Sequence, residues 1–448
     1  MIVKNSALLL ERIGRDKKTI FIFLLSTFLF CLRDGAIFSP DSNSYIGHSL
    51  IRMGTYPLII SFFQFLFKDY AFQILVGLQL ILSLIAPHLM SSFFTKSFNL
   101  PWQIHWVLLF VFLLPIVALK SANDILSEAL AYPLFLLASY FFLKGIFQTT
   151  IKDLYMFCFM IFLLTFTRQQ YIFYYGIALS SLVYLHLFQH FFKKKSQFLL
   201  AIVLSLSTYM ISERSYHYVY HNSFSGTPFT GEEIINRPLF LATEDSYKLF
   251  KDPKQSLFVE TAVLRILKKN LMDAEPAKRE LNLFYLNSNI IHHQIVSPLL
   301  EEIWDKKTLK DDMGDTYSEF EFRKFTDQQA ISITLTLIKN NFLSYMKNYI
   351  KDVMRGFGGY AYFAIVFFIT ILLVWNCIMR KNINLFHLSF VFSSLIHLGN
   401  LSLVCLVEPP ILRYTYSTGL LLFAMLLILG YQFTTLTLLK KSDVLCVE

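Results

Sequence analysis

The sequence is short of charge. Only 16% of its 448 residues are charged, whereas an ordinary soluble domain carries about a quarter. Hydrophobic residues make up 55% of the chain and the mean hydropathy is +0.51. This composition excludes intrinsic disorder, a collagen-like fibre and an ordinary soluble domain. It indicates an integral membrane protein.

Cysteine is also scarce, and its positions exclude two kinds of site. The five cysteines lie in or beside apolar runs or in the C-terminal tail: Cys31, Cys158, Cys377, Cys405 and Cys446. None falls in the polar segment 213–352, so we expect neither a disulfide framework nor a zinc cluster there. His217 and His221 have helical spacing without a third ligand, and we interpret them as interface or loop histidines. The chain has no Walker loop, Gly-x-Ser-x-Gly elbow or dinucleotide fingerprint.

What the chain does have is a series of apolar runs. A bilayer core is crossed by about 20 mostly apolar residues in a helix. Runs of this kind predict ten spans, near residues 19–38, 71–93, 102–119, 127–147, 153–167, 169–192, 197–212, 359–379, 384–406 and 411–438. The apolar stretch 56–67 is too short to span and is predicted to lie at the interface or to re-enter it. The predicted fold class is an all-α integral membrane protein.

Charge predicts the orientation. Basic residues stay on the cytoplasmic side of short loops, and one assignment places 15 basic groups against five acidic ones inside. Both termini are then cytoplasmic. The first apolar run has no small-residue cleavage site, so it is interpreted as a retained signal anchor. The net charge of +9 is therefore an orientation signal and not a nucleic-acid footprint.

One segment breaks the apolar pattern. Residues 213–352 hold 20 acidic and 18 basic residues, and helical periodicity recurs within them. We expect a mostly helical extracytoplasmic domain, inserted between spans seven and eight. The predicted organisation is a membrane module of about seven spans at 1–212, with a first outer loop at 33–70, then this domain at 213–352, and a membrane module of about three spans at 353–448.

Acidic residues at the outer ends of the spans are the candidate catalytic groups. Asp34 and Asp41 lie in the first outer loop, and Asp124 and Glu128 lie four positions apart near the predicted fourth span. This spacing puts the latter two on one helix face, where helix capping by Asn123 or Asp124 is an equally good explanation. For Asp41 the alternative is a turn after a proline. The functional hypothesis makes Asp41 a general base near the membrane.

Basic residues on the same predicted side complement these acids. Arg168 and Arg413 stand at outer span ends, and Lys120 precedes the Asp124 segment. Arginine binds phosphate through two parallel hydrogen bonds, so a lipid-phosphate site is one interpretation. For either arginine alone, snorkelling or an ion pair with a neighbouring acid explains its position as well.

The order of these segments resembles the C-type-fold membrane glycosyltransferases that use a polyprenyl-phosphate-linked sugar. The likeness rests on Asp41-Ser42-Asn43-Ser44-Tyr45 followed by Gly54-Thr55-Tyr56-Pro57-Leu58, on Ser127-Glu128, on Thr167-Arg168 and on Arg413-Tyr414. A departure is Ser42, where several subfamilies have a second acid, so Asp34, Asp124 and Glu128 all stay open as the partner of Asp41.

The resemblance implies a bacterial inner-membrane enzyme with its site facing the periplasm. It would transfer a sugar, with inversion, from a polyprenyl-phosphate donor to a glycan or lipid acceptor of the cell envelope. Asp41 would be the base, and Arg168, Arg413 and Lys120 would hold the lipid phosphate; no metal or cofactor is expected. An O-antigen polymerase or ligase is the main alternative. A transporter or flippase fits less well because no internal repeat is present.

Overall fold

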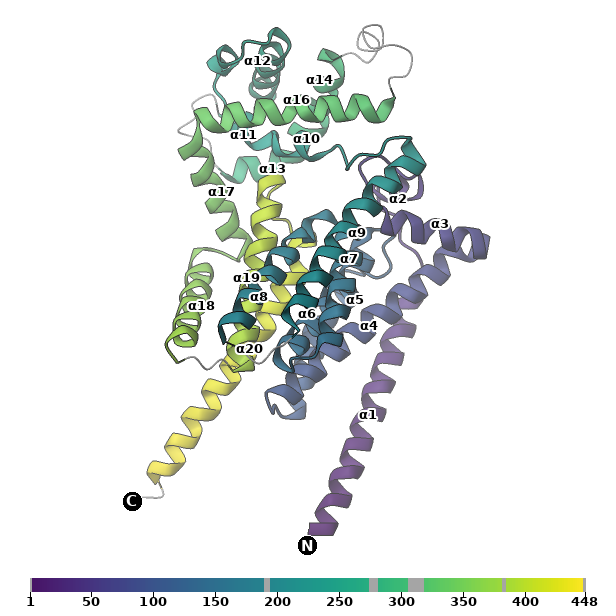
Figure 1. Cartoon of the computed structure of the whole chain (residues 1–448), viewed down its shortest axis with the longest axis vertical. Helices are drawn as coiled ribbons and strands as arrows, with labels where there is room; N and C mark the ends of the chain where they lie inside the picture. Colours follow the sequence, from purple (N-terminus) through teal and green to yellow (C-terminus); the bar gives the residue numbers. More distant parts are fainter. Residues whose placement is uncertain (1, 189–193, 274–280, 305–317, 381–383, 446–448) are drawn as a thin grey trace. The chain divides into compact units, whose positions relative to one another are not determined.

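The structure is a computed structural model that describes residues 2–188, 194–273, 281–304, 318–380 and 384–445 (Figure 1). Within these ranges the chain is all-α, and its one β feature is an isolated parallel bridge between Ile37 and Asp124. The predicted fold class is thereby confirmed at the level of all-α. The early helices are α1 (Ile2–Leu32), α2 (Ser42–Ile46), α3 (Thr55–Phe67), α4 (Ala71–Ser97), α5 (Trp102–Ala118), α6 (Ser127–Phe147), α7 (Ile151–Thr167), α8 (Phe173–Phe188) and α9 (Lys195–His221).

The helices after α9 begin in the polar segment 213–352. They are α10 (Thr230–Ile234), α11 (Asn236–Leu241), α12 (Pro253–Lys268), α13 (Leu281–Ile291), α14 (Ser297–Ile303), α16 (Glu319–Asn340), α17 (Phe342–Gly356), α18 (Tyr360–Arg380), α19 (Leu385–Val407) and α20 (Leu412–Leu445). A single π-helical turn, His292–Val296, joins α13 to α14.

The prediction of ten spans is wrong. Among the described residues five helical segments are long and apolar enough to cross a membrane, and a sixth is obtained if α17 and α18 form one broken span. The five are Thr55–Ser97, Ser127–Phe147, Lys195–His221, Leu385–Val407 and Leu412–Thr435. These spans fit a multi-pass membrane protein.

The overcount has a physical cause. Helices α5 and α7 are apolar but have only 17 residues each, which is short for a bilayer core. Helix α1 is long, yet Lys17 and Lys18 lie within it and leave too short an apolar stretch before its end. Residues 189–192, the end of the predicted span 169–192, lie outside the described ranges.

The chain forms two compact units. The N-terminal unit contains residues 1–49, 53–169 and 179–206, and the C-terminal unit contains residues 50–52, 170–178 and 207–448. The helices of the polar segment and the last apolar helices thus belong to one unit, and an extracytoplasmic domain inserted between spans is not shown. The division at 213 and 353 stays a prediction.

In the N-terminal unit, α4, α5, α6 and α7 pack side by side (Figure 1). Helix α6 is buried on nearly every side, as expected for a helix that is apolar all round. A β-carbon at Gly145 would stand 2.7 Å from the side chain of Leu154, so glycine allows α6 and α7 to approach closely there. At the turn between these helices Lys144 Nζ lies 3.0 Å from Asp153 Oδ1.

Helix α3 is the short apolar helix that the sequence predicted at the membrane interface. Its first turn is buried through Thr55, Tyr56 and Pro57, whereas Phe62 and Phe65 are 57% and 82% exposed. Because Thr55–Phe67 is also the first part of the candidate span Thr55–Ser97, the interfacial position of α3 stays a prediction.

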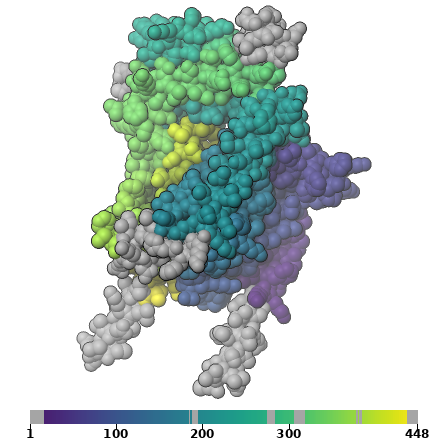
Figure 2. Space-filling model, in the orientation of Figure 1, coloured from purple at the N-terminus to yellow at the C-terminus, as the bar shows by residue number. Residues whose placement is uncertain are grey.

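In the C-terminal unit, the helices from α10 to α17 enclose a hydrophobic core that includes Phe240, Phe258, Trp304 and Ile333. Helix α12, in teal-green, packs directly on α16, in light green (Figure 2). Helices α17 and α18 meet at an angle of 84°, and Gly358 and Gly359 at the bend have φ of +96° and +116°. Only glycine adopts these angles without strain.

Candidate functional site

The loop after α1 is fixed against the segment that precedes α6. The Asn123 side chain is fully buried, and its amide nitrogen donates to the carbonyl oxygens of Cys31 (2.9 Å) and Gly35 (2.8 Å). Next to it, Ile37 N–H donates to Asn123 O, and Ile125 N–H donates to Ile37 O, both at 2.9 Å. Two segments almost ninety positions apart are therefore held side by side, and both carry predicted site residues.

Helix capping by Asn123 or Asp124, the alternative that sequence left open, is wrong. Helix α6 begins at Ser127, after Leu126 at the capping position, with no side-chain cap. The Asn123 amide is used on the preceding loop instead. Asp124 lies before the helix in the β-bridge with Ile37, so it does not share a helix face with Glu128.

Asp34 and Lys120 form an ion pair in this region. Lys120 Nζ lies 3.2 Å from Asp34 Oδ2, with side-chain exposures of 50% and 20%. Because the lysine is half exposed, water screens the pair and its contribution to stability is small. Its effect is local: it brings a predicted catalytic acid and a predicted phosphate ligand into direct contact.

Glu128 and Arg168 form another ion pair, and this one is nearly buried. Arg168 Nη1 lies 2.7 Å from Glu128 Oε1, with side-chain exposures of 14% and 10%. Arg168 follows the last residue of α7, and its backbone N–H still donates to Leu164 O at 2.9 Å. An ion pair with a neighbouring acid, one of the two alternatives considered for this arginine, is therefore confirmed.

A chain of hydrogen bonds leads from this ion pair to the loop of Asp41. Ser127 Oγ donates to Glu128 Oε2 at 3.3 Å, and Tyr45 Oη lies 2.9 Å from Ser127 Oγ. A serine hydroxyl has a single hydrogen. Since that hydrogen is directed at Glu128, Tyr45 donates its own to Ser127. Tyr45 belongs to α2, the short helix that begins directly after Asp41.

Asp41 itself is half-buried and stands at the capping position of α2. Its side chain makes no capping hydrogen bond to this helix, whereas Ser42 Oγ accepts from Ser39 N–H at 2.9 Å. Ser42 therefore helps to stabilise the turn after Pro40. The role of Asp41 as a base stays a prediction.

Tyr56 on α3 and Gln79 on α4 contact Tyr45 and the Asp124 segment. Tyr56 is fully buried and packs edge-on against Tyr45, with ring centroids 5.4 Å apart. Gln79 Nε2 donates to Tyr56 Oη at 2.8 Å, and both side chains are directed at the carbonyl oxygen of Asp124, at 3.4 and 3.5 Å. The Tyr-Pro stretch quoted for the family resemblance thus begins a helix that braces the Asp124 segment.

Arg413 belongs to the C-terminal unit, in the first turn of α20. It is exposed, donates to Tyr414 Oη at 2.5 Å and lies over the ring of the same tyrosine at 4.8 Å. In the N-terminal unit the structure brings together Asp34, Lys120, Asp124, Glu128 and Arg168, next to the helix of Asp41. Arg413 is not part of that unit.

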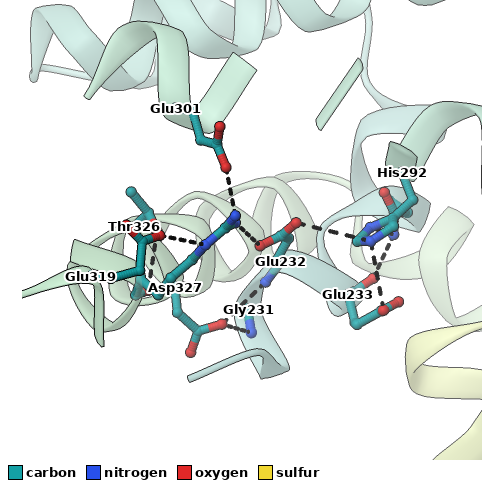
Figure 3. Close-up of polar contacts among 10 residues, drawn as sticks. Gly231, Glu232, Glu233, His292, Glu301, Glu319, Thr326 and Asp327 are labelled. Carbon is teal, nitrogen blue, oxygen red and sulfur yellow. Dashed lines mark hydrogen bonds and ion pairs between the residues drawn. The ribbon is translucent and has the colours of Figure 1, made fainter. Parts of the chain in front are cut away.

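A second polar cluster, which sequence reasoning missed, lies in the C-terminal unit (Figure 3). Asp327 on α16 accepts hydrogen bonds from the N–H groups of Gly231 (2.6 Å) and Glu232 (3.2 Å) at the start of α10. Arg323, one turn earlier on α16, lies 3.4 Å from Glu232 and 2.5 Å from Glu301. The cluster thereby joins α10, α14 and α16.

His292 faces the same pair of glutamates. Its Nε2 lies 3.9 Å from Glu232 Oε1 and 3.7 Å from Glu233 Oε1, and its ring is 7% exposed. Burial and the neighbouring His293 lower the pKa of His292 to about 4. Burial, with repulsion from Glu408 and Glu232, raises the pKa of Glu233 well above its usual range. At neutral pH the imidazole of His292 is therefore neutral.

Within the part of the chain that the structure describes, no group of three or more His, Cys, Asp or Glu side chains is placed to hold a metal ion. His217 is fully buried in α9, and its Nε2 lies 3.1 Å from Thr227 Oγ1, which donates to Glu213 at 3.0 Å. This histidine therefore helps to hold the loop that follows α9.

No protein-family model, no curated protein and no solved structure matches the chain. The family is therefore not identified, and the resemblance to the C-type-fold glycosyltransferases stays a prediction from the motifs.

Proposed function

We propose that the chain is a membrane glycosyltransferase. It would move a sugar from a polyprenyl-phosphate donor to a cell-envelope glycan or lipid acceptor at the outer face of a bacterial inner membrane. The observation that carries this proposal is the ion pair of Glu128 with Arg168, linked through Ser127 and Tyr45 to the helix that Asp41 begins.

Three features of this arrangement support a phosphate-dependent transfer. Ionisable groups at the ends of membrane helices are costly to bury and for that reason indicate a functional site. Arg168 carries a permanent charge in a nearly buried position, where its interaction with an anion is weakly screened. Lys120 and Asp34 add a second pair of opposite charges at the loop before α2.

The proposed reaction assigns a role to each group. Asp41 accepts the proton of the acceptor hydroxyl as its oxygen attacks the anomeric carbon from the face opposite the phosphate. The bond between that carbon and the phosphate oxygen breaks, and polyprenyl phosphate leaves as an anion. Arg168 and Lys120 stabilise the negative charge that develops on the leaving phosphate. Arg413 remains a further candidate for the phosphate.

The test is a transfer assay with purified protein in nanodiscs. Polyprenyl-phosphate sugars and an envelope glycan acceptor are supplied to the wild type, to Asp41→Asn and to Asp69→Asn. Asp69 lies on the exposed turn Lys68–Tyr70 and serves as the matched control. We expect Asp41→Asn to lower kcat by a factor of about 100 or more, as for loss of a general base, and Asp69→Asn to retain activity.

Two results would contradict the proposal. Equal transfer rates for the wild type and Asp41→Asn would remove Asp41 as the base. If the wild type consumed no lipid-linked sugar of any kind, the glycosyltransferase assignment itself would fail.

A further inference from the structure

We infer that Tyr45 and Ser127 are positioning residues that act on the lipid phosphate through Glu128 and Arg168. The inference rests on the proposed function and deepens it, because it adds two residues to the phosphate site that neither contact the phosphate nor carry a charge. The observation behind it is the continuous series of contacts from Tyr45 Oη to Ser127 Oγ, to the Glu128 carboxylate and to Arg168 Nη1, at 2.9, 3.3 and 2.7 Å.

The direction of the hydrogens makes this a polarised chain. Glu128 as a carboxylate accepts on both oxygens, from Ser127 on Oε2 and from Arg168 on Oε1. Ser127 in turn accepts from Tyr45. All donors therefore point toward the same negative charge, and hydrogen bonds arranged in this way strengthen one another at low dielectric.

Burial makes the geometry specific. Tyr45 is 6% and Ser127 2% exposed, so bulk water cannot easily replace either hydroxyl. Without Ser127 Oγ, the Glu128 carboxylate loses one donor on Oε2, and its orientation is less firmly fixed. The position of the Arg168 guanidinium follows the carboxylate to which it is paired, and recognition of a phosphate by arginine depends on the orientation of that planar group.

The series of hydrogen bonds from Tyr45 to Arg168 also connects the proposed phosphate site with the helix of the proposed base. Tyr45 lies on α2, one turn after Asp41, so the hydroxyl that supports Glu128 moves with the helix that the proposed base begins. A shift of α2 changes the first hydrogen bond of the chain. Occupation of the phosphate site and the position of α2 are therefore coupled through the buried side chains.

Tyr45→Phe and Ser127→Ala test the inference, with Tyr132→Phe as the matched control. Tyr132 is another buried tyrosine of the N-terminal unit, on the same helix as Glu128, and its hydroxyl donates to Phe112 O at 2.5 Å, outside the chain. Binding of a polyprenyl phosphate to each protein in phosphatidylcholine nanodiscs is measured, together with kcat, KM and the melting temperature. Inorganic phosphate is added in a second arm as a competitor.

We expect Tyr45→Phe and Ser127→Ala to raise the Kd for the polyprenyl phosphate, and the KM for the donor, by about threefold to tenfold, the effect of losing a buried hydrogen bond. Tyr132→Phe lowers the melting temperature to a similar degree but leaves Kd unchanged. When Arg168 is already replaced by Gln, adding Tyr45→Phe should not change Kd further. The hydrogen bonds that begin at Tyr45 then no longer end on a cation. Competition by millimolar inorganic phosphate would assign the recognition to the phosphate group alone, and its absence would add the lipid chain to it; in both cases the dependence on Tyr45 and Ser127 is expected to hold.

Failure of the inference and failure of the proposed function give different results. If Arg168→Gln weakens binding but Tyr45→Phe and Ser127→Ala bind as the wild type does, the positioning role is overturned and the phosphate site is kept. Equal weakening by Tyr132→Phe, or full additivity with Arg168→Gln, shows a purely structural effect and also overturns it. If the wild type binds no polyprenyl phosphate, both the inference and the phosphate site are removed.

Discussion

Arg168 and Glu128 are joined by a 2.7 Å ion pair in which both side chains are at least 86% buried. Each charge lost its hydration when the chain folded, and each is compensated by the other. Removal of one member therefore leaves an uncompensated charge in a nearly dry environment. This relationship is the strongest electrostatic link among the predicted site residues, and it gives the first prediction.

Glu128→Ala should destabilise the N-terminal unit by about 3 kcal/mol, the cost expected when one partner of a buried pair is removed. Asp34→Ala, which breaks the more exposed pair with Lys120, should cost less than about 1 kcal/mol. Thermal unfolding in detergent, followed by tryptophan fluorescence, measures both. Equal midpoints for Glu128→Ala and Asp34→Ala would show that burial does not distinguish the two pairs.

The sequence identified candidate site residues, but it did not show which of them pair with one another. The loop of Asp34 and Asp41, the segment from Lys120 to Glu128, and Arg168 were all identified as candidates. The pair of Asp34 with Lys120 was not predictable, because it joins segments almost ninety positions apart that are held together by the β-bridge at Ile37. For Arg168 the sequence suggested an ion pair with an acid but not that the acid is Glu128. The capping interpretation failed since α6 begins at Ser127 and Asn123 is used elsewhere.

The fold, too, could be predicted only in part from the sequence. The all-α class followed from hydrophobic runs, but the number of spans did not, because an apolar helix of 17 residues gives nearly the same signal as a full span. The cluster around Glu232 and His292 gave no local signal. Its members come from α10, the π-helical turn and α16, in a segment whose many charges resemble those of a solvated surface.

The C-terminal unit contains another buried ion pair, between Arg237 and Asp352. Its variants can distinguish the cost of leaving one charge unpaired from the contribution of the intact pair to stability. Arg237 Nη2 lies 2.6 Å from Asp352 Oδ2 and donates to Cys405 O at 2.8 Å, with both side chains at most 2% exposed. Asp352→Leu should cost more than the double variant Arg237→Met/Asp352→Leu, because the double variant leaves no buried charge. We expect a difference of about 2 kcal/mol in the free energy of unfolding in urea or guanidinium. A double variant that is less stable than Asp352→Leu would contradict the prediction.

Gly231 is predicted to tolerate no side chain. A β-carbon at this position would lie 2.2 Å from the carbonyl oxygen of Asp327 and 2.8 Å from the side chain of Ile331, so α10 or α16 has to move. Gly231→Ala should lower stability by about 1–3 kcal/mol, as other overpacked cores do, and should weaken the capping of α10 by Asp327. Gly77→Ala is the control, since a β-carbon there meets no atom within 4 Å. Similar melting temperatures for the two variants would refute the close approach.

The pH dependence of stability should have a component from His292, and its sign follows from the direction of the shift. The folded pKa of about 4 lies below the ordinary value of 6.5, so the unfolded chain binds more protons between these two values. The contribution of His292 to stability is therefore full above about pH 6.5. It falls as the pH decreases toward 4 and does not change further below pH 4. His292→Asn should remove this component, which amounts to at most about 3 kcal/mol.

Glu233 should give the opposite pH dependence, because its pKa is raised whereas that of His292 is lowered. Its pKa is raised, so the folded state holds a proton that the unfolded chain releases above about pH 4.5, and stability is lost as pH rises through the raised pKa. Glu233→Gln should therefore be more stable than the wild type at neutral pH, and the two should differ less in acid. Unfolding midpoints of the wild type, His292→Asn and Glu233→Gln between pH 4 and 8 separate the contributions. If Glu233→Gln were less stable than the wild type at neutral pH, the raised pKa of Glu233 would be refuted.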